Sequence, residues 1–428
     1  MKVAIAGFGV EGQANNDYFR RQGHDVTIVD ERELAPTDLP YGTAAILGKG
    51  AFERLDGFDV VVRTAGLAPH KIKTDGTIWS GTNEFFATCP APIIGVTGSK
   101  GKGTTSSLIA AILRAAGYTV HLVGNIGDPA ISELGKIKAS DLVVYEMSSF
   151  QLWDATRSPQ VAVVLYIEPE HLDVHKDFND YISAKANIAI HQTANDIVIY
   201  NGDNLHATKI ARQSNGAKIP YQHEKAAHMK DGYFWFGETR LCPVDALKLP
   251  GMHNLDNACA AISAAWKWVK DPAVIAEGLS SFTGLPHRLK YVRTVNDVAY
   301  YDDSIATTPG SAIAALRAFT QPKVLILGGS DKGADYAELA KEVAAHDVSH
   351  VILIGSEAPK IEKALRKENL SNILNLGSDT TMQKVVDQAS QLAEPGSVVV
   401  LSPACASFGM FKNYVDRGNQ FIDAVNAL

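Results

Sequence analysis

The residues best suited to chemistry form a glycine- and lysine-rich segment at positions 98–105. The segment consists of Gly98, Ser99, Lys100, Gly101, Lys102, Gly103, Thr104 and Thr105. A short apolar run at 93–97 precedes it and an apolar-rich stretch at 106–116 follows, which predicts a strand, a tight loop and a helix start. Backbone N–H groups of such a loop and the helix N-terminus bind nucleotide phosphates. The segment therefore predicts an enzyme that uses ATP.

Two features separate this loop from the common P-loop. Its glycines Gly98 and Gly101 lie closer together than the usual spacing, and Gly103 follows the lysine where Ser or Thr normally reaches Mg²⁺. Glycine permits close approach of the backbone to phosphate, and the nearest hydroxyl, on Thr104, is then expected to meet the metal. The alternative is a Gly/Ser-rich turn with a solvated lysine.

Glu146 and His171 are further candidate site residues, because each follows an apolar run. Glu146 ends the run that starts at Leu142, and His171 comes shortly after the run at 161–167. Ligands bind at the carboxyl ends of strands in open parallel sheets, so both side chains are expected to converge near the phosphate loop. The alternatives are that Glu146 caps the next helix and that His171 is a structural loop histidine.

A second glycine-rich motif, Gly-Phe-Gly-Val-Glu-Gly at 7–12, follows the apolar run at 3–6. A predicted helix comes next, and the strand predicted at 26–30 ends in Asp30. This is the dinucleotide-binding fingerprint in its usual context. It predicts a nucleotide at the first turn and leaves open whether that is NAD, FAD or a UDP-sugar.

Composition indicates a globular, non-membrane protein of several domains. The 428 residues are 46% hydrophobic and 20% charged, and the net charge of −7 argues against a nucleic-acid binder. The cysteines Cys89, Cys242, Cys259 and Cys405 form no C-x-x-C pair, which indicates reduced thiols. Because the start of the sequence resembles no signal peptide and no apolar run is long enough to cross a membrane, a cytoplasmic location is expected.

Apolar runs alternate with helix-length amphipathic stretches along nearly the whole chain, which predicts α/β architecture with mainly parallel sheets. We expect three domains, each an open sheet with helices: a Rossmann-like domain at 1–87, a P-loop ATPase-like domain at 88–284 and a Rossmann-like domain at 285–428. In the third, strands are expected at 298–301, 323–327, 351–354 and 397–401.

Taken in order, the motifs resemble those of the Mur ligases over essentially the full length. They are Gly-Phe-Gly-Val-Glu-Gly at 7–12, the phosphate loop, Gly-Asn-Ile-Gly at 124–127, Glu-Met-Ser-Ser-Phe-Gln-Leu at 146–152, His171-Leu172-Asp173, Lys185, Gly-Met-His-Asn-Leu-Asp-Asn at 251–257, Gly-Leu-Pro-His-Arg at 284–288, Asp303-Ser304, Lys332 and Leu-Ser-Pro-Ala-Cys-Ala-Ser at 401–407. The motifs at 284–288 and 401–407 are most similar to the D-glutamate-adding branch.

The resemblance implies an ADP-forming amide ligase of peptidoglycan synthesis, and hence of cell-wall growth, cell shape and division. ATP would phosphorylate the carboxylate of UDP-N-acetylmuramoyl-L-alanine, and the amino group of D-glutamate would displace phosphate from the acyl phosphate. Implied cofactors are ATP, Mg²⁺ at two sites and a carbamylated Lys185. A monomer is expected, without nucleic acid or membrane as partner. Without the resemblance, Lys185 would be an ordinary helix-surface lysine.

The resemblance also implies site residues, with Lys102, Glu146, His171 and Lys185 as the catalytic set. The implied metal ligands are Thr104, Glu146, His171 and Lys185. The ATP-binding residues would be Gly98, Ser99, Lys100, Gly101, Lys102, Gly103, Thr104, Thr105, Asn257, Arg288 and Asp303. The UDP-substrate would bind Val10, Glu11, Asp30, Arg32, Thr64, Gly66, Asn125 and His171. The amino acid would bind Thr307, Lys332, Ser407 and Tyr414.

Three alternatives stay open. One is another Mur-type or folylpolyglutamate-synthase-like ligase with a different acceptor, because Ile305 stands where the D-glutamate branch usually has lysine. The second is an NAD-dependent oxidoreductase built on the fingerprint at 7–12. The third is a catalytically silent nucleotide-binding module, for which Gly103 and Ile305 are the motivating residues.

Overall fold

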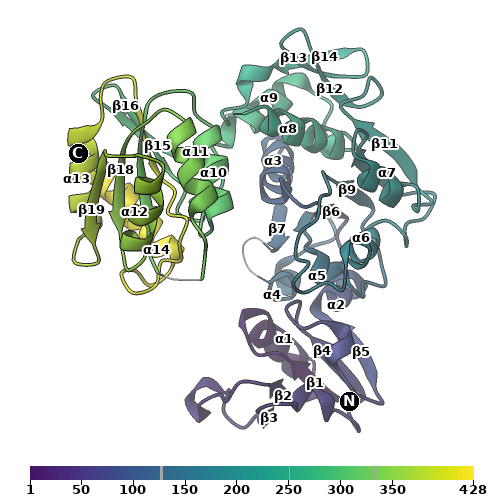
Figure 1. The fold of residues 1–428 in the computed structure, drawn as a ribbon. Helices are drawn as coiled ribbons and strands as arrows, with labels where there is room; N and C mark the ends of the chain where they lie inside the picture. The colour runs from purple at the N-terminus through teal and green to yellow at the C-terminus, as the bar shows by residue number, and fades with distance from the viewer. Residues whose placement is uncertain (126–128, 250, 331–332) are drawn as a thin grey trace. The chain divides into compact units, whose positions relative to one another are not determined.

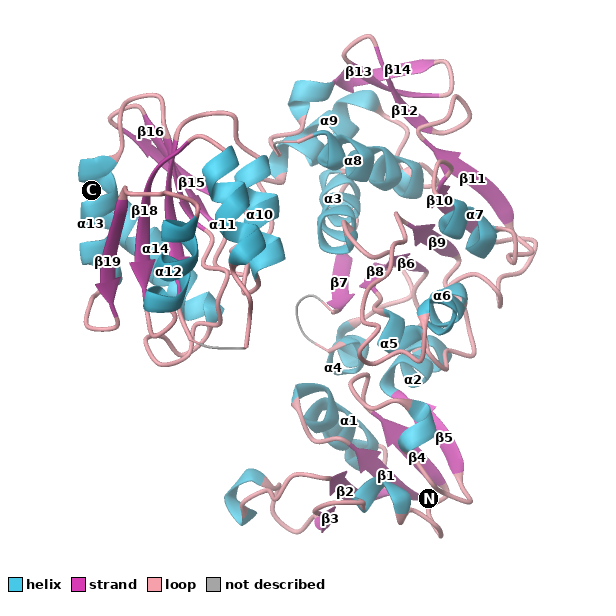
Figure 2. Ribbon diagram, viewed as in Figure 1, coloured by secondary structure: helices cyan, strands magenta, loops and turns pink. Residues whose placement is uncertain are grey.

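The computed structural model describes residues 1–125, 129–249, 251–330 and 333–428. They form two compact units, the first comprising Met1–Lys248 with Met252–Phe282 and the second Leu249–Gly251 with Thr283–Leu428 (Figure 1). Open, mainly parallel sheets with helices make up both units, which confirms the expected α/β class (Figure 2). The boundaries expected at 87/88 and 284/285 stay predictions.

The first sheet is parallel and five-stranded, in the order β3-β2-β1-β4-β5. Its strands are β1 (Lys2–Ala6), β2 (Asp25–Asp30), β3 (Ala44–Leu47), β4 (Val60–Arg63) and β5 (Thr77–Ser80), and its helices are α1 (Val10–Arg21) and α2 (Gly81–Thr88). The fingerprint glycines make the β1–α1 turn possible. Gly7 has a φ of +94°, and a Cβ there would lie 2.3 Å from Oγ1 of Thr64. The β1–α1 and β4 turns can therefore approach closely.

The second sheet of the first unit is parallel and six-stranded, in the order β11-β10-β9-β6-β8-β7. Its strands are β6 (Ile93–Thr97), β7 (Val120–Gly124), β8 (Leu142–Glu146), β9 (Val161–Val164), β10 (Ile197–Asn201) and β11 (Ala217–Tyr221). The associated helices are α3 (Lys102–Ala115), α4 (Ala130–Glu133), α5 (Ser149–Leu152), α6 (Phe178–Ala186), α7 (Leu205–Ala211), α8 (Met252–Ala265) and α9 (Pro272–Ser281). Because β6 and β8 are adjacent and parallel, the phosphate loop and Glu146 lie at the same edge of this sheet, where the strands have their carboxyl ends.

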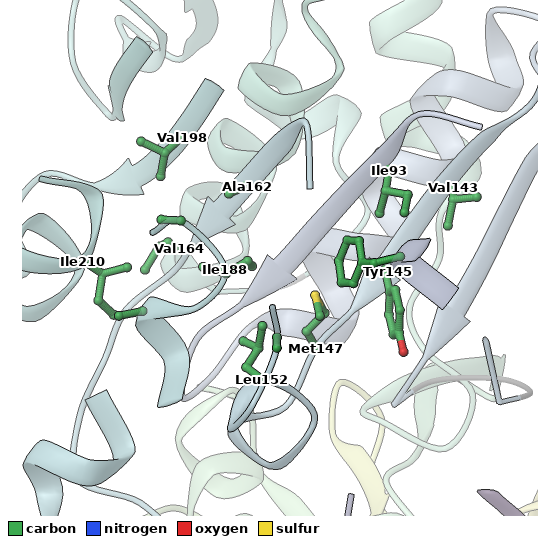
Figure 3. Packing of buried hydrophobic residues seen from close by; sticks show 14 of the residues in the cluster. Ile93, Val143, Tyr145, Met147, Leu152, Ala162, Val164, Ile188, Val198 and Ile210 are labelled. Atoms are coloured by element: carbon green, nitrogen blue, oxygen red, sulfur yellow. The ribbon is translucent and has the colours of Figure 1, made fainter. Parts of the chain in front are cut away.

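One face of this sheet holds an apolar core (Figure 3). Helix α2 also contributes side chains to this core. Phe85 and Phe86 of α2 are buried against Tyr145 of β8, with ring centroids 5.3 Å and 6.0 Å from the tyrosine ring. Aromatic side chains bury large apolar areas. This packing joins helix α2 to the six-stranded sheet of the first unit, which we call the central sheet.

A three-stranded antiparallel sheet was not anticipated from the sequence. It consists of β12 (Ala227–Lys230), β13 (Tyr233–Phe236) and β14 (Thr239–Pro243). Asp231 and Gly232 connect its first two strands, with φ of 51° and 75°. A two-residue Asp-Gly loop with both φ positive is the preferred hairpin turn, so this dipeptide was the available signal.

The second unit contains a six-stranded sheet in the order β15-β16-β20-β17-β18-β19, in which the β15–β16 pair is antiparallel and the other pairs are parallel. Its strands are β15 (Lys290–Val295), β16 (Val298–Asp302), β17 (Lys323–Gly328), β18 (Val348–Ile354), β19 (Ile373–Gly377) and β20 (Val398–Leu401). The helices are α10 (Pro309–Arg317), α11 (Ala337–Ala345), α12 (Ala358–Lys367), α13 (Met382–Leu392) and α14 (Tyr414–Asn426). Four strands overlap the expected ones, whereas β15 and β19 were missed.

Short 3-10 helices cover Pro36–Asp38, Ala51–Glu53, Pro69–Lys71, Leu134–Lys136 and Val244–Ala246. All four cysteines are free thiols. Among the described residues, no helix has the length and apolarity that a membrane crossing requires.

Candidate active site

The phosphate loop joins the buried strand β6 to helix α3, as the sequence predicted. Gly101 precedes α3 with a φ of +83°, and a Cβ there would lie 2.3 Å from Oδ1 of Asn257. The same Oδ1 accepts a hydrogen bond of 3.3 Å from the hydroxyl of Thr105. Asn257, on α8, is thus in direct contact with the loop.

Ser99 ties the loop to the segment after β9. Its hydroxyl donates to the carbonyl of Glu168 at 2.9 Å and accepts from the Glu168 N–H at 3.0 Å. The hydroxyl of Tyr181 lies 2.9 Å from the same Oγ. The ammonium of Lys100 pairs with the Glu168 carboxylate at 2.6 Å, largely in solvent. These contacts hold the first half of the loop in place.

Lys102 lies at the first turn of α3 and folds back over the loop. Its ammonium donates to the carbonyls of Gly98 at 2.9 Å and Ser99 at 2.8 Å. Gly103 and Thr104 follow in the first turn, where Thr104 is buried. N–H groups at a helix N-terminus and a nearby ammonium together form an anion-binding site.

Lys185 is buried in α6, with 1% of its surface exposed, so the expectation of an ordinary surface lysine is wrong. Its ammonium donates to Thr97 Oγ1 at 3.2 Å and to the carbonyl of Gly98 at 2.9 Å, and it lies 4.7 Å from the ring centre of Tyr181. Burial, and then repulsion by Lys102, lower the pKa of Lys185 well below its usual value. A buried amine with a lowered pKa is available in its neutral, nucleophilic form.

Glu146 ends strand β8 and is buried beside the loop after β7. Its Oε1 accepts from Nδ2 of Asn125 at 3.0 Å, and its carbonyl accepts from the Asn125 N–H at 3.1 Å. The helix-capping alternative for Glu146 is wrong, because Ser148 caps α5 in a capping box with Gln151.

His171 lies in the loop after β9, half exposed, with a φ of +56°. Its ring centroid is 4.9 Å from that of Phe150, and its Nε2 is 3.9 Å from the carboxylate of Glu170. Glu170 accepts a hydrogen bond of 3.2 Å from Tyr181, which also contacts Ser99. His171 is therefore linked to the phosphate loop through two intermediate side chains.

The described residues contain no group of three or more His, Cys, Asp or Glu side chains arranged to hold a metal. The metal-ligand set of Thr104, Glu146, His171 and Lys185 accordingly stays a prediction. Within this set, the hydroxyl of Thr104 and the carboxylate of Glu146 are oxygen ligands of the kind that Mg²⁺ uses when substrate phosphates and water complete its shell.

A cavity of about 360 Å³ opens within the first unit, between the fingerprint turn and the loop after β7. Val10, Glu11, Gly66 and Asn125 line it, so four of the residues predicted to bind the UDP-substrate come together. The carboxylate of Glu11 accepts from the Ala65 N–H at 2.8 Å, and burial raises the pKa of Glu11. The turn after β4 is thus fixed against the fingerprint.

The other residues predicted for the UDP-substrate are not among those lining the cavity. Asp30 accepts from the Phe8 N–H at 2.8 Å and from the Arg32 guanidinium at 2.8 Å and 3.0 Å. Burial alone would raise the pKa of Asp30, but these hydrogen bonds lower it to about 2. Thr64 donates to the carbonyl of Ala6 through its N–H at 3.0 Å. His171 lies outside the lining as well.

Sequence reasoning missed Arg63, a fully buried residue at the end of β4. It pairs with Asp154, which follows helix α5, and donates to the carbonyls of Leu67 and Phe150. The sequence did contain a signal for it, because a cation directly follows the apolar run at 60–62. A charged residue at the end of a buried strand suggests a buried ion pair.

In the second unit, Asp303 lies buried at the carboxyl end of β16. It accepts from Ser402 Oγ at 2.7 Å and from the Leu289 N–H at 3.1 Å. Burial raises the pKa of Asp303 to about 7, although these bonds and the charge of the neighbouring Arg288 oppose the rise. Asp303 and Arg288 are therefore close together.

Of the residues predicted to bind the amino acid, Thr307 follows β16, whereas Ser407 and Tyr414 follow β20, the adjacent parallel strand. Ser304 donates to the carbonyl of Tyr414 at 2.8 Å, and the buried Arg417 donates to carbonyls of Ser304 and Cys405. Thr307 is half-buried, Ser407 buried and Tyr414 exposed. Lys332 lies outside the described residues.

Two family descriptions match the chain: Mur ligase middle domain at residues 96–265, and Mur ligase, glutamate ligase domain at residues 287–405. A relative from Acetivibrio thermocellus, named UDP-N-acetylmuramoylalanine–D-glutamate ligase, is 40% identical and is covered over 96% of its length by the whole of this chain. A relative of the same name from Clostridium tetani is 37% identical, with 100% of this chain and 97% of the relative covered.

Solved structures share the fold at low identity. The UDP-N-acetylmuramate-alanine ligase of Thermotoga maritima has a TM-score of 0.61 at 16% identity, covering 100% of this chain and 99% of that chain. The MurF ligase of Thermotoga maritima in complex with ADP has a TM-score of 0.58 at 18% identity, with 99% and 93% covered.

Proposed function

This chain belongs to the Mur ligase family, and from that premise we propose that it adds D-glutamate to UDP-N-acetylmuramoyl-L-alanine, with conversion of ATP to ADP and phosphate. The observation that carries the proposal is the full-length likeness to D-glutamate ligases, at 35–40% identity. The product is an amide formed in peptidoglycan synthesis. We expect the enzyme to work in the cytoplasm, as a monomer.

The reaction joins a carboxylate, a triphosphate and an amine in two steps. The substrate carboxylate oxygen attacks the γ-phosphorus, and the bond to the β-phosphate oxygen breaks to release ADP. The D-glutamate nitrogen then attacks the acyl carbon, loses a proton and displaces phosphate. Both steps bring anions together, so the site must concentrate positive charge.

The phosphate loop suits the triphosphate. N–H groups at the start of α3 face the loop, and Lys102 already lies over the Gly98 and Ser99 carbonyls. We propose that Lys102 exchanges these carbonyls for phosphate oxygens when the nucleotide binds. Residues 98–105 and Asn257 would surround the phosphates and the adjoining part of the nucleotide, and Arg288 and Asp303 would complete the ATP contacts.

Magnesium fits the residues at the loop. Thr104 and Glu146 would hold the first ion, since Glu146 is a buried carboxylate at the strand end next to β6. His171 and a modified Lys185 would hold the second. When bound, Mg²⁺ polarises phosphoryl oxygens and offsets their charge.

The surroundings of Lys185 support our proposal that this lysine is carbamylated. The neutral amine would attack CO₂ at carbon and lose a proton to become a carbamate, which places an anion where the unmodified lysine is neutral or, when protonated, cationic. Lys102, which repels the ammonium, would attract this anion. The carbamate would then supply an oxygen ligand where an ammonium would repel Mg²⁺.

The cavity bordered by Val10, Glu11, Gly66 and Asn125 is proposed to hold the UDP-substrate. Asp30 and Arg32 form a hydrogen-bonded pair beside the fingerprint turn, on the expected uridine side. In the second unit, Thr307, Ser407 and Tyr414, together with Lys332, are proposed to bind D-glutamate.

The experiment is a phosphate-release assay with purified protein, ATP, Mg²⁺ and UDP-N-acetylmuramoyl-L-alanine. The acceptors to compare are D-glutamate, L-lysine, diaminopimelate and L-alanine. We expect phosphate release when D-glutamate is the acceptor and no release with the other three amino acids. Release with another acceptor would indicate a different Mur-type ligase, and no release with any of them would favour a silent nucleotide-binding module.

A further inference from the structure

We propose that Arg63 is a positioning residue that holds the two walls of the substrate cavity in register, with Asp154 as its partner. The inference rests on the proposed function, because the cavity is taken to hold the UDP-substrate. Arg63 ends β4 of the first sheet, and Asp154 follows α5 of the central sheet; both labels can be followed in Figure 1.

Every N–H of the Arg63 guanidinium has an acceptor. Nε and Nη2 contact the two carboxylate oxygens of Asp154, the former at 2.7 Å. Nη2 also donates to the carbonyl of Phe150 at 2.9 Å. Nη1 donates to the carbonyls of Leu67 at 3.2 Å and Thr64 at 3.3 Å. The guanidinium, which is 0% exposed, thus uses its planar set of five donors on both domains.

These acceptors come from two segments that both contribute residues to the lining of the cavity. Thr64 and Leu67 are the ends of the turn after β4, closed by a Leu67 N–H to Thr64 carbonyl bond of 3.0 Å. Gly66 of that turn lines the cavity, and so does Phe150. The Phe150 ring also contacts His171. A displacement of Arg63 would therefore change the distance between the substrate-side turn and the site residues around His171.

The two sheets of the first unit would stay packed together without Arg63. Asn83 of α2 donates to the carbonyl of Asp154 at 3.0 Å, and its Oδ1 accepts from the Thr156 N–H at 2.9 Å. Phe85 and Phe86 bury their rings against the central core. Loss of Arg63 should therefore shift the turn locally rather than separate the sheets.

A stability role alone does not account for the pair. Replacing a buried ion pair by apolar side chains of similar size is often neutral or stabilising. What apolar residues cannot reproduce is the simultaneous hold on three backbone carbonyls. Reactions that join bound groups are sensitive to small displacements of those groups.

The decisive protein is the full-length double variant Arg63→Met/Asp154→Leu, which removes both charges and leaves an apolar side chain at each position. We expect its melting temperature to stay close to that of the wild type. Its kcat/KM for UDP-N-acetylmuramoyl-L-alanine should fall about tenfold or more, because the turn is no longer held in register. ADP affinity, measured by calorimetry, should not change. The matched control removes the exposed pair Glu53 and Lys73 in the first sheet's domain, as Glu53→Leu/Lys73→Met, and should change neither value.

A double variant with wild-type kcat/KM would overturn the proposal, and so would an equal loss of ADP affinity, which would indicate general disruption. If the double variant does not fold, Arg63→Lys decides. Lysine keeps the charge but lacks the planar set of donors, so the same loss of kcat/KM is expected. Wild-type kinetics in Arg63→Lys would then refute the role. If the wild type itself shows no D-glutamate-dependent turnover, the proposed function fails separately, and calorimetric affinity for the UDP-substrate replaces kcat/KM.

Discussion

The ammonium groups of Lys102 and Lys185 donate to the same acceptor, the carbonyl oxygen of Gly98, each at 2.9 Å. The two lysines come from the phosphate loop's helix α3 and from α6, far apart in the sequence. The two like charges repel each other, and Lys185 is the more deeply buried of the two. Burial and the repulsion by Lys102 therefore both disfavour protonation of Lys185. The Gly98 carbonyl is thus shared by Lys102, the lysine proposed to bind the nucleotide phosphates, and Lys185, the lysine proposed to be carbamylated.

Substituting Lys102 should reduce carbamylation of Lys185. In Lys102→Met the repulsion is lost, so the pKa of Lys185 rises and less of the amine is neutral at a given pH. The same substitution removes a cation that would stabilise the carbamate, and both effects have the same sign. The carbamate carbon, observed by ¹³C NMR with labelled bicarbonate at neutral pH, should give a weaker signal than in wild type. An equal or stronger signal would show that Lys102 does not control Lys185.

Removing Lys185 should separate activity from stability. We expect Lys185→Met to lower turnover by at least ~10²-fold, because an anionic group in the site is lost. Compared with wild type that carries an unmodified Lys185, its melting temperature should be unchanged or higher, because that buried amine forms no ion pair within the described part of the chain.

The rescue pattern of the smaller variant Lys185→Ala identifies the missing group. Short-chain carboxylates should partly restore turnover by standing in for the carbamate, whereas bicarbonate should not, because the amine that reacts with CO₂ is absent. Wild-type turnover in the unrescued variant would remove Lys185 from the mechanism.

Local patterns along the sequence were enough to predict the strand–loop–helix elements of the site. The run at 93–97 and the glycines after it gave β6 and the loop, and the fingerprint gave β1 and α1. Lys185 shows the limit, because its burial depends on where α6 packs against the loop and not on its own neighbours in the chain. Arg63 was missed for a similar reason: its partner Asp154 is distant in sequence and follows a helix of the other sheet of the first unit. The β15 strand and the β12–β14 sheet lie outside the alternation of parallel strand and helix, which explains their absence from the prediction.

Gly101 should tolerate no side chain. Gly101→Ala would place a Cβ 2.3 Å from Asn257 Oδ1 while keeping a φ of +83°. We expect ADP affinity to fall by roughly tenfold or more, because the loop N–H groups and Asn257 would have to move.

Gly117→Ala is the matched control for backbone strain. Gly117 follows the other end of α3 with a φ of +84°, and no atom of the described residues lies within 4 Å of the position that its Cβ would occupy. The variant should lose a comparable amount of stability and keep ADP affinity. An equal loss of affinity in both variants, measured by calorimetry, would show that helix strain and not the Asn257 contact is responsible.

Asp303 should make stability fall as pH rises toward neutrality. Its folded-state pKa of about 7 exceeds the ordinary value of 3.8, so the folded protein holds a proton that the unfolded chain releases between these values. This contribution is fully present below pH 3.8 and is lost as pH rises through about 7. Asp303→Asn cannot lose that proton, and its melting temperature should therefore decline less than that of wild type over the same window. Over this window the free energy of unfolding of the wild type should fall by on the order of a few kcal/mol more than that of Asp303→Asn, because the carboxylate is buried.

The exposed Asp423 supplies the comparison for Asp303. Asp423→Asn, in α14 of the same unit, should follow the wild-type pH profile, since its side chain is in solvent in the folded protein as in the unfolded chain. Scanning calorimetry across the window gives all three profiles. If wild type, Asp303→Asn and Asp423→Asn decline in parallel, Asp303 ionises normally. Ser402 and the Leu289 N–H would then outweigh the burial of the carboxylate between β16 and β20.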